Sequence, residues 1–138
     1  MRLTTFSDYS LRTLIVLAVK RQSTIAEIAH LYGISEAHLN KVIHQLGVAG
    51  DIETIRGRGG GIRLARAPEA INVGTVVRRT EDLALVVCLE GGACLIAPAC
   101  VLQTALKEAT AAFLAVLDRY TIADLVSSPA VARLLEVA

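Results

Sequence analysis

The hydrophobic pattern near the N-terminus predicts a helix. Apolar side chains between residues 8 and 19 recur at the spacing of one helical face: Leu11, Leu14, Ile15 and Ala18. Ser7 precedes this stripe as a predicted N-cap, and the helix is expected to end near Lys20. We interpret this helix as a scaffold of the core.

The next two apolar segments predict a helix-turn-helix. Thr24 and Glu27 have the spacing of a capping box at the start of the first segment. Gly33 then marks a C-terminal stop, and Ser35 caps the second segment. The apolar positions of both segments point to one shared core: Ile25, Ile28, Ala29, Ile34, Leu39 and Val42. Residues 36–46 are therefore the predicted recognition helix.

Strand-like alternation of apolar and polar residues replaces the helical pattern after Gly50. Residues 51–55 and 62–66 are typical of two strands, joined by the glycine-rich turn 56–61. A β-hairpin directly after a helix-turn-helix is the wing of a winged helix. A short helix, residues 73–80, is expected after the wing.

The last third of the chain predicts a long helix with a heptad seam. Pro98 stands where the first turn should begin, and apolar residues then recur in steps of four and three. The seam residues are Leu102, Leu106, Ala109, Phe113, Val116 and Tyr120. A helix of about 22 residues, or roughly 33 Å, is too long to bury this seam within so small a domain. We therefore expect it to pair with the same helix of a second subunit.

These elements together predict a mainly α fold. Residues 1–80 are expected to form a winged helix-turn-helix with a β-hairpin wing, 81–101 a loop that contains all three cysteines, and 98–138 a dimerisation helix and C-terminal tail. Within the tail, Thr121 should cap a final short turn, and Pro129 should loosen the last residues of the chain.

Composition agrees with one small domain that carries an extension. The chain has 138 residues, 54% of them hydrophobic, and its mean hydropathy of +0.54 is high for a monomer, which favours a homodimer. The apolar run 14–19 is far shorter than the roughly 20 residues of a membrane span. Asp8 and Arg12 also interrupt any signal-peptide pattern, so we expect a cytoplasmic protein with no membrane partner.

Charge is divided unevenly along the chain. Residues 1–80 carry 11 Lys and Arg against 6 Asp and Glu, a net charge of +5, whereas residues 81–138 carry 3 against 7, a net charge of −4. Because duplex DNA is a polyanion, the basic N-terminal half is expected to contact it.

The outward positions of the predicted recognition helix supply candidate DNA contacts. Leu39, Val42, Ile43 and Leu46 point inward, which leaves six residues outward: Glu36, Ala37, His38, Asn40, Lys41 and His44. The first of these should reach base edges, and Lys41 should meet phosphate. Thr24 and Ser35, at the two helix starts, belong to the same candidate set. An ordinary solvated face is the alternative, which the neighbouring wing disfavours.

The wing adds three arginines, Arg56, Arg58 and Arg63, on a glycine-rich hairpin. Such a hairpin suits the minor groove, because glycine lets the backbone approach phosphates closely. A nucleotide-binding loop is the alternative. It is disfavoured because the turn has neither the Lys-Ser/Thr of a P-loop nor a G-x-G-x-x-G register.

All three cysteines fall in one short segment, at Cys88, Cys94 and Cys100. Five residues separate each pair, which is too wide for the Cys-x-x-Cys pairs of structural zinc, and no histidine lies nearby. Three thiolates on a loop suit an iron–sulfur cluster, either 4Fe-4S or 2Fe-2S, with one further ligand. Zinc, thiol redox chemistry and inert packing remain as alternatives. No cysteine-histidine-carboxylate arrangement supports an enzyme.

Four segments carry a resemblance that extends from end to end of the chain. They are Leu3-Thr-Thr-Phe-Ser-Asp-Tyr9, Arg56-Gly-Arg-Gly-Gly-Gly-Ile-Arg-Leu64, Ile96-Ala-Pro-Ala-Cys-Val-Leu102 and Leu117-Asp-Arg-Tyr-Thr-Ile-Ala-Asp-Leu-Val126. In these segments the chain resembles the bacterial iron–sulfur winged-helix transcription regulators, above all their nitric-oxide-sensing branch. The resemblance implies a homodimeric repressor of operator DNA whose three cysteines bind a 4Fe-4S cluster. It also implies that nitric oxide is the signal that lowers DNA affinity.

The resemblance further implies a fourth cluster ligand. In the nitric-oxide-sensing branch it is an N-terminal aspartate of the partner subunit, and the matching residue is Asp8. A sister branch has a histidine three residues after the last cysteine, where this chain has Gln103, which disfavours that branch. Asp8 could instead be a helix N-terminal carboxylate favoured by the macrodipole. Arg12, one turn later, would orient the Asp8 carboxylate or form a simple surface pair.

Overall fold

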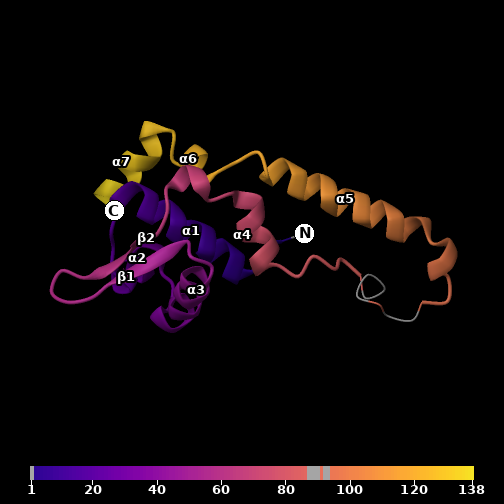
Figure 1. Ribbon diagram of the computed structural model, residues 1–138, viewed down its shortest axis with the longest axis horizontal. Helices are drawn as coiled ribbons and strands as arrows, with labels where there is room; N and C mark the ends of the chain where they lie inside the picture. The colour runs from indigo at the N-terminus through magenta and orange to yellow at the C-terminus, as the bar shows by residue number, and fades with distance from the viewer. Residues whose placement is uncertain (1, 87–90, 92–93) are drawn as a thin grey trace.

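The computed structural model describes residues 2–86, 91 and 94–138. Its elements in chain order are α1 (Thr5–Lys20), α2 (Ile25–Tyr32), α3 (Glu36–Val48), β1 (Ile52–Ile55), β2 (Gly61–Leu64), η1 (Pro68–Ala70), α4 (Val73–Thr80), η3 (Ala97–Ala99), α5 (Val101–Leu117), α6 (Ile122–Leu125) and α7 (Pro129–Val137). The expected mainly helical winged helix-turn-helix with one β-hairpin is confirmed. Figure 1 shows α5 extending away from the winged helix-turn-helix along the longest axis.

The core is built from the apolar faces of the first four helices and the inner side of the hairpin. The fully buried side chains include Leu14, Leu17, Ile28, Leu39, Val42, Ile62, Val76 and Val77. All four α3 residues predicted to point inward are buried. Burial of one such side chain contributes roughly 1.5–3 kcal/mol to stability. The apolar side chains that give the sequence its helical periodicity therefore also stabilise the fold.

Helix α1 begins three residues earlier than predicted. Its N-cap is Thr4, whose hydroxyl accepts a 3.2 Å hydrogen bond from the Ser7 N–H. The prediction of Ser7 as N-cap was wrong. Ser7 lies in the first turn, where it is buried and donates a 2.7 Å hydrogen bond to the Thr80 hydroxyl of α4. The hydroxyl groups of Thr4 and Ser7 could each cap a helix. Because the Ser7 hydroxyl is bonded to Thr80 of α4, Thr4 is the residue that caps α1.

The caps of the helix-turn-helix are as predicted. Thr24 and Glu27 form a complete capping box on α2, and Ser35 caps α3 by accepting from the His38 N–H. Gly33 adopts the left-handed conformation, with φ of 63°, at the turn between the helices. The helix-turn-helix geometry therefore follows from local chemistry.

The wing is an antiparallel pair, β1 with β2, in the register Ile52 to Leu64 and Ile55 to Gly61. It is anchored beyond its own strands, because Ser23 forms a β-bridge with Ile62. The Gln22 side-chain amide also donates a 2.7 Å hydrogen bond to the Gly59 carbonyl. The loop between α1 and α2 thus holds the turn of the wing.

Helix α5 is shorter than predicted. It has 17 residues and begins at Val101, whereas Pro98 lies in a separate 3-10 turn. Cys100 breaks the helical path between them, with φ and ψ of −80° and 102°. The predicted 22-residue helix starting at Pro98 was therefore wrong. Tyr120, assigned to the seam, lies beyond the end of α5.

The C-terminal tail folds back onto the core. Thr121 caps α6 as predicted, through a capping box with Asp124. The Thr121 N–H and then its hydroxyl hold the pKa of Asp124 below its usual value. Pro129 does not loosen the chain. It begins α7 after the Ser128 N-cap, and α7 packs against α1.

Helices α4 and α5 are joined at one corner. Arg78 binds Asp118 through two hydrogen bonds, of 2.5 and 2.6 Å, which lower the pKa of that carboxyl group. Gly74 faces the same group, and a Cβ there would clash with Asp118 Oδ1. A side chain at position 74 would therefore displace the Asp118 carboxylate from its contact with Arg78. Within the described residues, no helix is long and apolar enough to cross a membrane.

Candidate functional site

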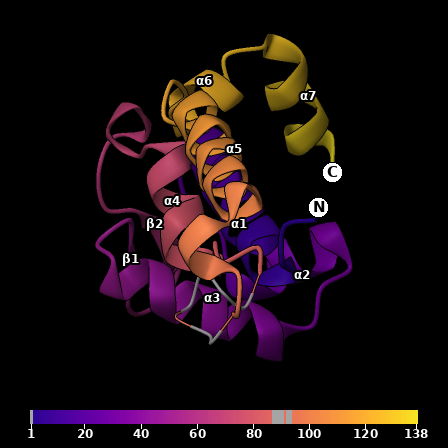
Figure 2. The ribbon, with the colours of Figure 1, turned by 90° about the vertical axis from the view of Figure 1, so that its right-hand side faces the viewer.

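The outer face of α3 is solvent-exposed along its length. Every predicted DNA-contacting residue of this helix is exposed: Glu36, Ala37, His38, Asn40 and Lys41. The Asn40 amide donates a 2.9 Å hydrogen bond to the Glu36 carbonyl of its own helix. In Figures 1 and 2, α2 and α3 lie on the side of the molecule opposite α6 and α7. This side is accessible to a duplex.

The two capping residues are already engaged. The Thr24 hydroxyl accepts from the Glu27 N–H, and the Ser35 hydroxyl accepts from the His38 N–H. The Thr24 N–H and the Ser23 hydroxyl donate to the Glu27 carboxylate and hold its pKa below the usual value. The N-terminus of α2 is thus already bonded to the carboxylate of its own Glu27. The N-terminus of α3 is exposed, and exposed helix N-termini are suited to bind phosphate.

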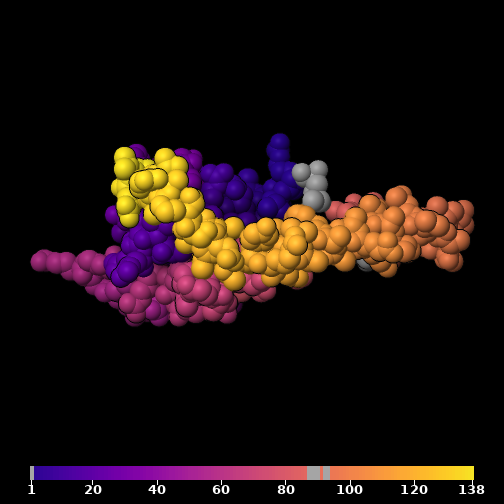
Figure 3. All heavy atoms as spheres, turned by 90° about the horizontal axis from the view of Figure 1, so that it is seen from above, coloured from indigo at the N-terminus to yellow at the C-terminus, as the bar shows by residue number. Residues whose placement is uncertain are grey.

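The wing arginines differ in their surroundings. Arg56 and Arg58 lie exposed at the tip, on either side of Gly57, whose φ is 92°. Arg63 instead donates a 2.6 Å hydrogen bond across the hairpin to Glu53. Figure 3 shows the wing projecting from the body at the end opposite α5. The geometry favours Arg56 and Arg58 over Arg63 as direct DNA contacts.

The cysteine segment lies at the start of α5. Cys94 is exposed and Cys100, the N-cap of α5, is half-buried, and neither forms a disulfide. Cys88 lies outside the described residues. Among the residues that the structure describes, no group of three or more His, Cys, Asp or Glu side chains is placed to hold a metal ion. Large apolar side chains next to Cys94 and Cys100 in the sequence are exposed: Leu95 (99%), Ile96 (63%), Val101 (81%) and Leu102 (63%).

Asp8 lies half-exposed in the first turn of α1. Its carboxylate accepts a 2.9 Å hydrogen bond from Arg12 Nε, the pair expected from their spacing. The Arg12 guanidinium carbon also lies 5.1 Å from the centre of the Tyr32 ring, within the range of a cation–π contact. Burial raises the pKa of Tyr32, and the charge of Arg12 partly opposes that rise. Arg12 thus connects Asp8 to the end of α2.

The seam of α5 divides into two parts. Leu102, Ala109 and Val116 are exposed, whereas Phe113 is half-buried. Phe113 lines an apolar cavity with Leu3 and Leu83 of the same chain. Leu114, which was not assigned to the seam, is buried. The exposed stripe available to a second subunit is therefore narrower than the six residues of the pattern.

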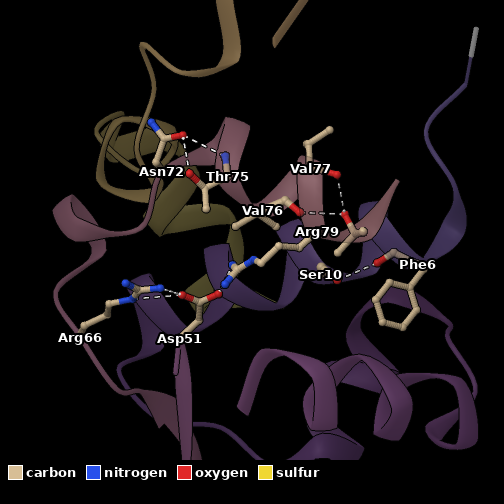
Figure 4. A network of polar contacts seen from close by, with 10 residues as sticks. Phe6, Ser10, Asp51, Arg66, Asn72, Thr75, Val76, Val77 and Arg79 are labelled. Atoms are coloured by element: carbon tan, nitrogen blue, oxygen red, sulfur yellow. Dashed lines mark hydrogen bonds and ion pairs between the residues drawn. The ribbon is translucent and has the colours of Figure 1, made fainter. Parts of the chain in front are cut away.

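Sequence reasoning missed a buried ionic cluster. Asp51, at the start of the hairpin, has no solvent exposure and is bound by Arg66 and by Arg79 of α4 (Figure 4). The sequence carried one signal for it, an aspartate at the first position of a strand pattern, directly after Gly50. The partners could not be assigned, because they lie 15 and 28 residues away along the chain.

Comparison with known proteins identifies relatives over nearly the whole chain. Residues 3–128 match the Rrf2 family, described as an iron-dependent transcriptional regulator. The chain is 54% identical to the HTH-type transcriptional regulator NsrR of Bacillus subtilis, over 93% of this chain and 92% of that protein. It is 52% identical to NsrR of Shouchella clausii, over 91% and 89%.

Solved structures of the same fold have lower identity. IscR of T. potens superposes with a TM-score of 0.74 and 27% identity, over 92% of this chain and 87% of that one. CymR, the global cysteine regulator of B. subtilis, superposes with a TM-score of 0.73 and 30% identity, over 92% and 97%. These neighbours agree with the helical winged-helix architecture.

Proposed function

Because the chain belongs to the Rrf2 family of iron-dependent transcriptional regulators, we propose that it is a homodimeric repressor that senses nitric oxide through a 4Fe-4S cluster. The family comprises DNA-binding transcription regulators and not enzymes. The observation that carries the proposal is a bonded connection between the DNA-binding side and the cysteines. Helix α4 packs on the winged helix, and Arg78 joins it to Asp118 at the C-terminal end of α5. Cys100 is the N-cap at the other end of the same helix, so α5 itself links this contact to the cysteine segment.

The donor chemistry of the cysteine segment fits a cluster. Cys94 and Cys100 are unpaired soft sulfur ligands. Cys100 precedes the first turn of α5, whose N–H groups lack helical acceptors and favour an anionic ligand. With Cys88, these residues would hold the cluster. A bound cluster would supply iron that reacts with nitric oxide.

A second subunit would complete the cluster site. Within one chain, Asp8 and the described cysteines do not form a metal-binding group. Asp8 is half-exposed and oriented by Arg12, which suits a ligand offered to another subunit. Asp8 of the partner subunit would then be the fourth ligand. The exposed apolar side chains beside Cys94 and Cys100 would be covered by the same contact.

The ligand set explains how a signal could change DNA binding. The two recognition helices of a dimer must fit half-sites on the order of 34 Å apart. A cluster shared between Asp8 of one subunit and the cysteines of the other would fix the angle between the subunits. Release of these side chains would free α5 and, through Arg78 and α4, change the spacing of the recognition helices.

Treatment with nitric oxide is the direct test of the proposal. Anaerobically purified protein is expected to contain iron and sulfide and to lose operator affinity by roughly 5 to 150-fold after exposure, the range typical of allosteric coupling. Iron and sulfide counts, visible absorbance and DNA titration before and after exposure provide the measurement. DNA affinity indifferent to the gas would contradict nitric-oxide sensing. Mössbauer spectra would distinguish a 4Fe-4S from a 2Fe-2S cluster, and iron-free protein with reversible disulfides would indicate a thiol switch.

Asp8→Ala tests the fourth ligand. If Asp8 binds iron, its loss should make the cluster more labile or change its reaction with nitric oxide, as measured by the decay of visible absorbance. Arg12→Ala is the matched control, since it breaks the same ion pair but leaves the carboxylate. Because an exposed pair contributes at most about 1 kcal/mol, both variants should fold. Cluster stability and nitric-oxide reactivity that are unchanged from wild type in Asp8→Ala would show that Asp8 serves only its ion pair with Arg12.

A further inference from the structure

The wing, the recognition helix and α4 are all bonded to one buried residue, Asp51. Asp51 is fully buried, and its two oxygens are bound by Arg66, just after β2, and by Arg79, in the last turn of α4. Figure 4 shows the two guanidinium groups approaching the carboxylate from different sides. We call these three residues the Asp51 cluster.

The backbone of Asp51 is bonded to both DNA-binding elements. Its N–H donates a 3.0 Å hydrogen bond to the Leu46 carbonyl of α3. Its carbonyl accepts a 2.9 Å hydrogen bond from the Ala65 N–H, directly after β2. A single residue therefore fixes the end of the recognition helix, the base of the wing and, through its side chain, α4.

Helix α4 connects this point to the rest of the regulator. Arg79 precedes Thr80, whose hydroxyl accepts the hydrogen bond from Ser7 at the start of α1. The next residue, Glu81, accepts 2.6 and 3.0 Å hydrogen bonds from the N–H and hydroxyl of Thr4. The chain then continues toward the cysteine segment. The Asp51 cluster thus lies between the DNA-binding elements and the C-terminal end of α4, from which the chain leads to the cysteine segment.

Stability alone gives a weak reason for this arrangement. A buried carboxylate is unfavourable unless it is paired, and a buried ion pair is often no more stabilising than apolar side chains of the same volume. What two arginines on different elements do provide is fixed geometry. The Arg66 and Arg79 side chains are 42% and 34% exposed, so only the carboxylate between them is inaccessible to water.

We propose that Asp51 is a positioning residue for DNA binding, which holds the wing and the recognition helix in fixed relation to α4 through Arg66 and Arg79. This role requires only the DNA binding of the family, and it applies whether or not a cluster is bound. Displacement of α4 would then move both DNA-contacting elements together. Asp51 itself need not touch the duplex.

The sign of a charge change separates positioning from simple electrostatics. Asp51→Asn removes a negative charge from a DNA-binding domain, so phosphate attraction alone predicts tighter binding. Positioning predicts weaker binding, because Arg66 and Arg79 lose their shared ionic partner. Glu53→Gln is the matched control. Glu53 lies exposed on β1, pairs with Arg63 and carries the same charge outside the Asp51 cluster.

The test is DNA titration of the full-length chain with a duplex that the wild-type protein selects from a random-sequence pool. Asp51→Asn is expected to raise Kd by roughly 5 to 150-fold, and Glu53→Gln to leave it unchanged or lower it. Arg79→Gln should weaken binding without changing its salt dependence, whereas loss of a phosphate contact would reduce the slope by about 0.9. Circular dichroism of each variant verifies folding.

Several results would overturn the proposal. The positioning role is contradicted if Asp51→Asn protein is folded and binds the selected duplex as tightly as wild type. If Asp51→Asn does not fold, Arg79→Gln decides, and unchanged affinity or a reduced salt slope overturns the positioning role. Wild-type protein that selects no duplex contradicts both this role and the proposed repressor. Binding that depends on Asp51 but ignores nitric oxide contradicts only the proposed signal.

Discussion

Cys100→Ser is expected to abolish the iron–sulfur cluster and to lower operator affinity by roughly 5 to 150-fold, the range of typical allosteric coupling. The thiolate is lost, and a hydroxyl is a poor ligand for cluster iron. The fold should persist, because Cys100 is the N-cap of α5 and makes no side-chain capping bond. Serine is a preferred N-cap residue, so α5 should be at least as stable as before.

Ala99→Ser is the matched control for this substitution. It introduces the same hydroxyl one residue earlier, at an exposed position of the 3-10 turn, and leaves every cysteine in place. Iron content, visible absorbance and DNA titration of both variants provide the measurement. A Cys100→Ser protein that retains its iron would remove Cys100 from the ligand set. Loss of iron with unchanged DNA affinity would instead separate the cluster from regulation.

Ile122→Ala is expected to destabilise the protein by about 2–5 kcal/mol. Ile122 is fully buried in the core cluster, although it belongs to the short C-terminal helix α6. Its N–H also donates a 2.9 Å hydrogen bond to the Ile71 carbonyl, beside α4. The substitution leaves a cavity where the tail meets the winged helix. Denaturant unfolding followed by circular dichroism measures the loss.

Leu134→Ala provides the comparison for Ile122→Ala. Leu134 lies on α7 and is 73% exposed, so its truncation should change the free energy of unfolding by no more than about 0.5 kcal/mol. A loss for Ile122→Ala as small as that for Leu134→Ala would mean that α6 does not share the core with the winged helix. A much larger loss for Ile122→Ala would make α6 part of the same cooperative unit as the winged helix.

Much of the DNA-binding side could be predicted from the sequence, because local chemistry specifies it. The capping box of Thr24 and Glu27, the left-handed Gly33 and the Ser35 cap all lie within a few residues of the turns they form. The four inward leucine, valine and isoleucine positions of α3 follow from the helical period alone. Exposure of the outer α3 residues was then a direct consequence.

The sequence could predict which residues belong to the candidate site, but not all of the side chains with which they interact. The sequence places Arg63 with Arg56 and Arg58 on one hairpin, yet Arg63 pairs with Glu53 on the opposite strand, a partner fixed by the strand register. The Asp8 and Arg12 pair was foreseeable from helical spacing, whereas the contact of Arg12 with Tyr32 depends on how α1 packs on α2. The ligand roles of the cysteines and of Asp8 remain predictions.

The sequence by itself determined the helices, the hairpin, most of the caps and the concentration of cysteines, because periodicity and capping act over a few residues. Tertiary structure alone decided which of Thr4 and Ser7 caps α1, that Pro129 starts a packed helix, and that Asp51 joins Arg66 to Arg79. The physical reason is distance along the chain. Ion pairs and core contacts between remote residues depend on how the elements pack, which no local pattern specifies.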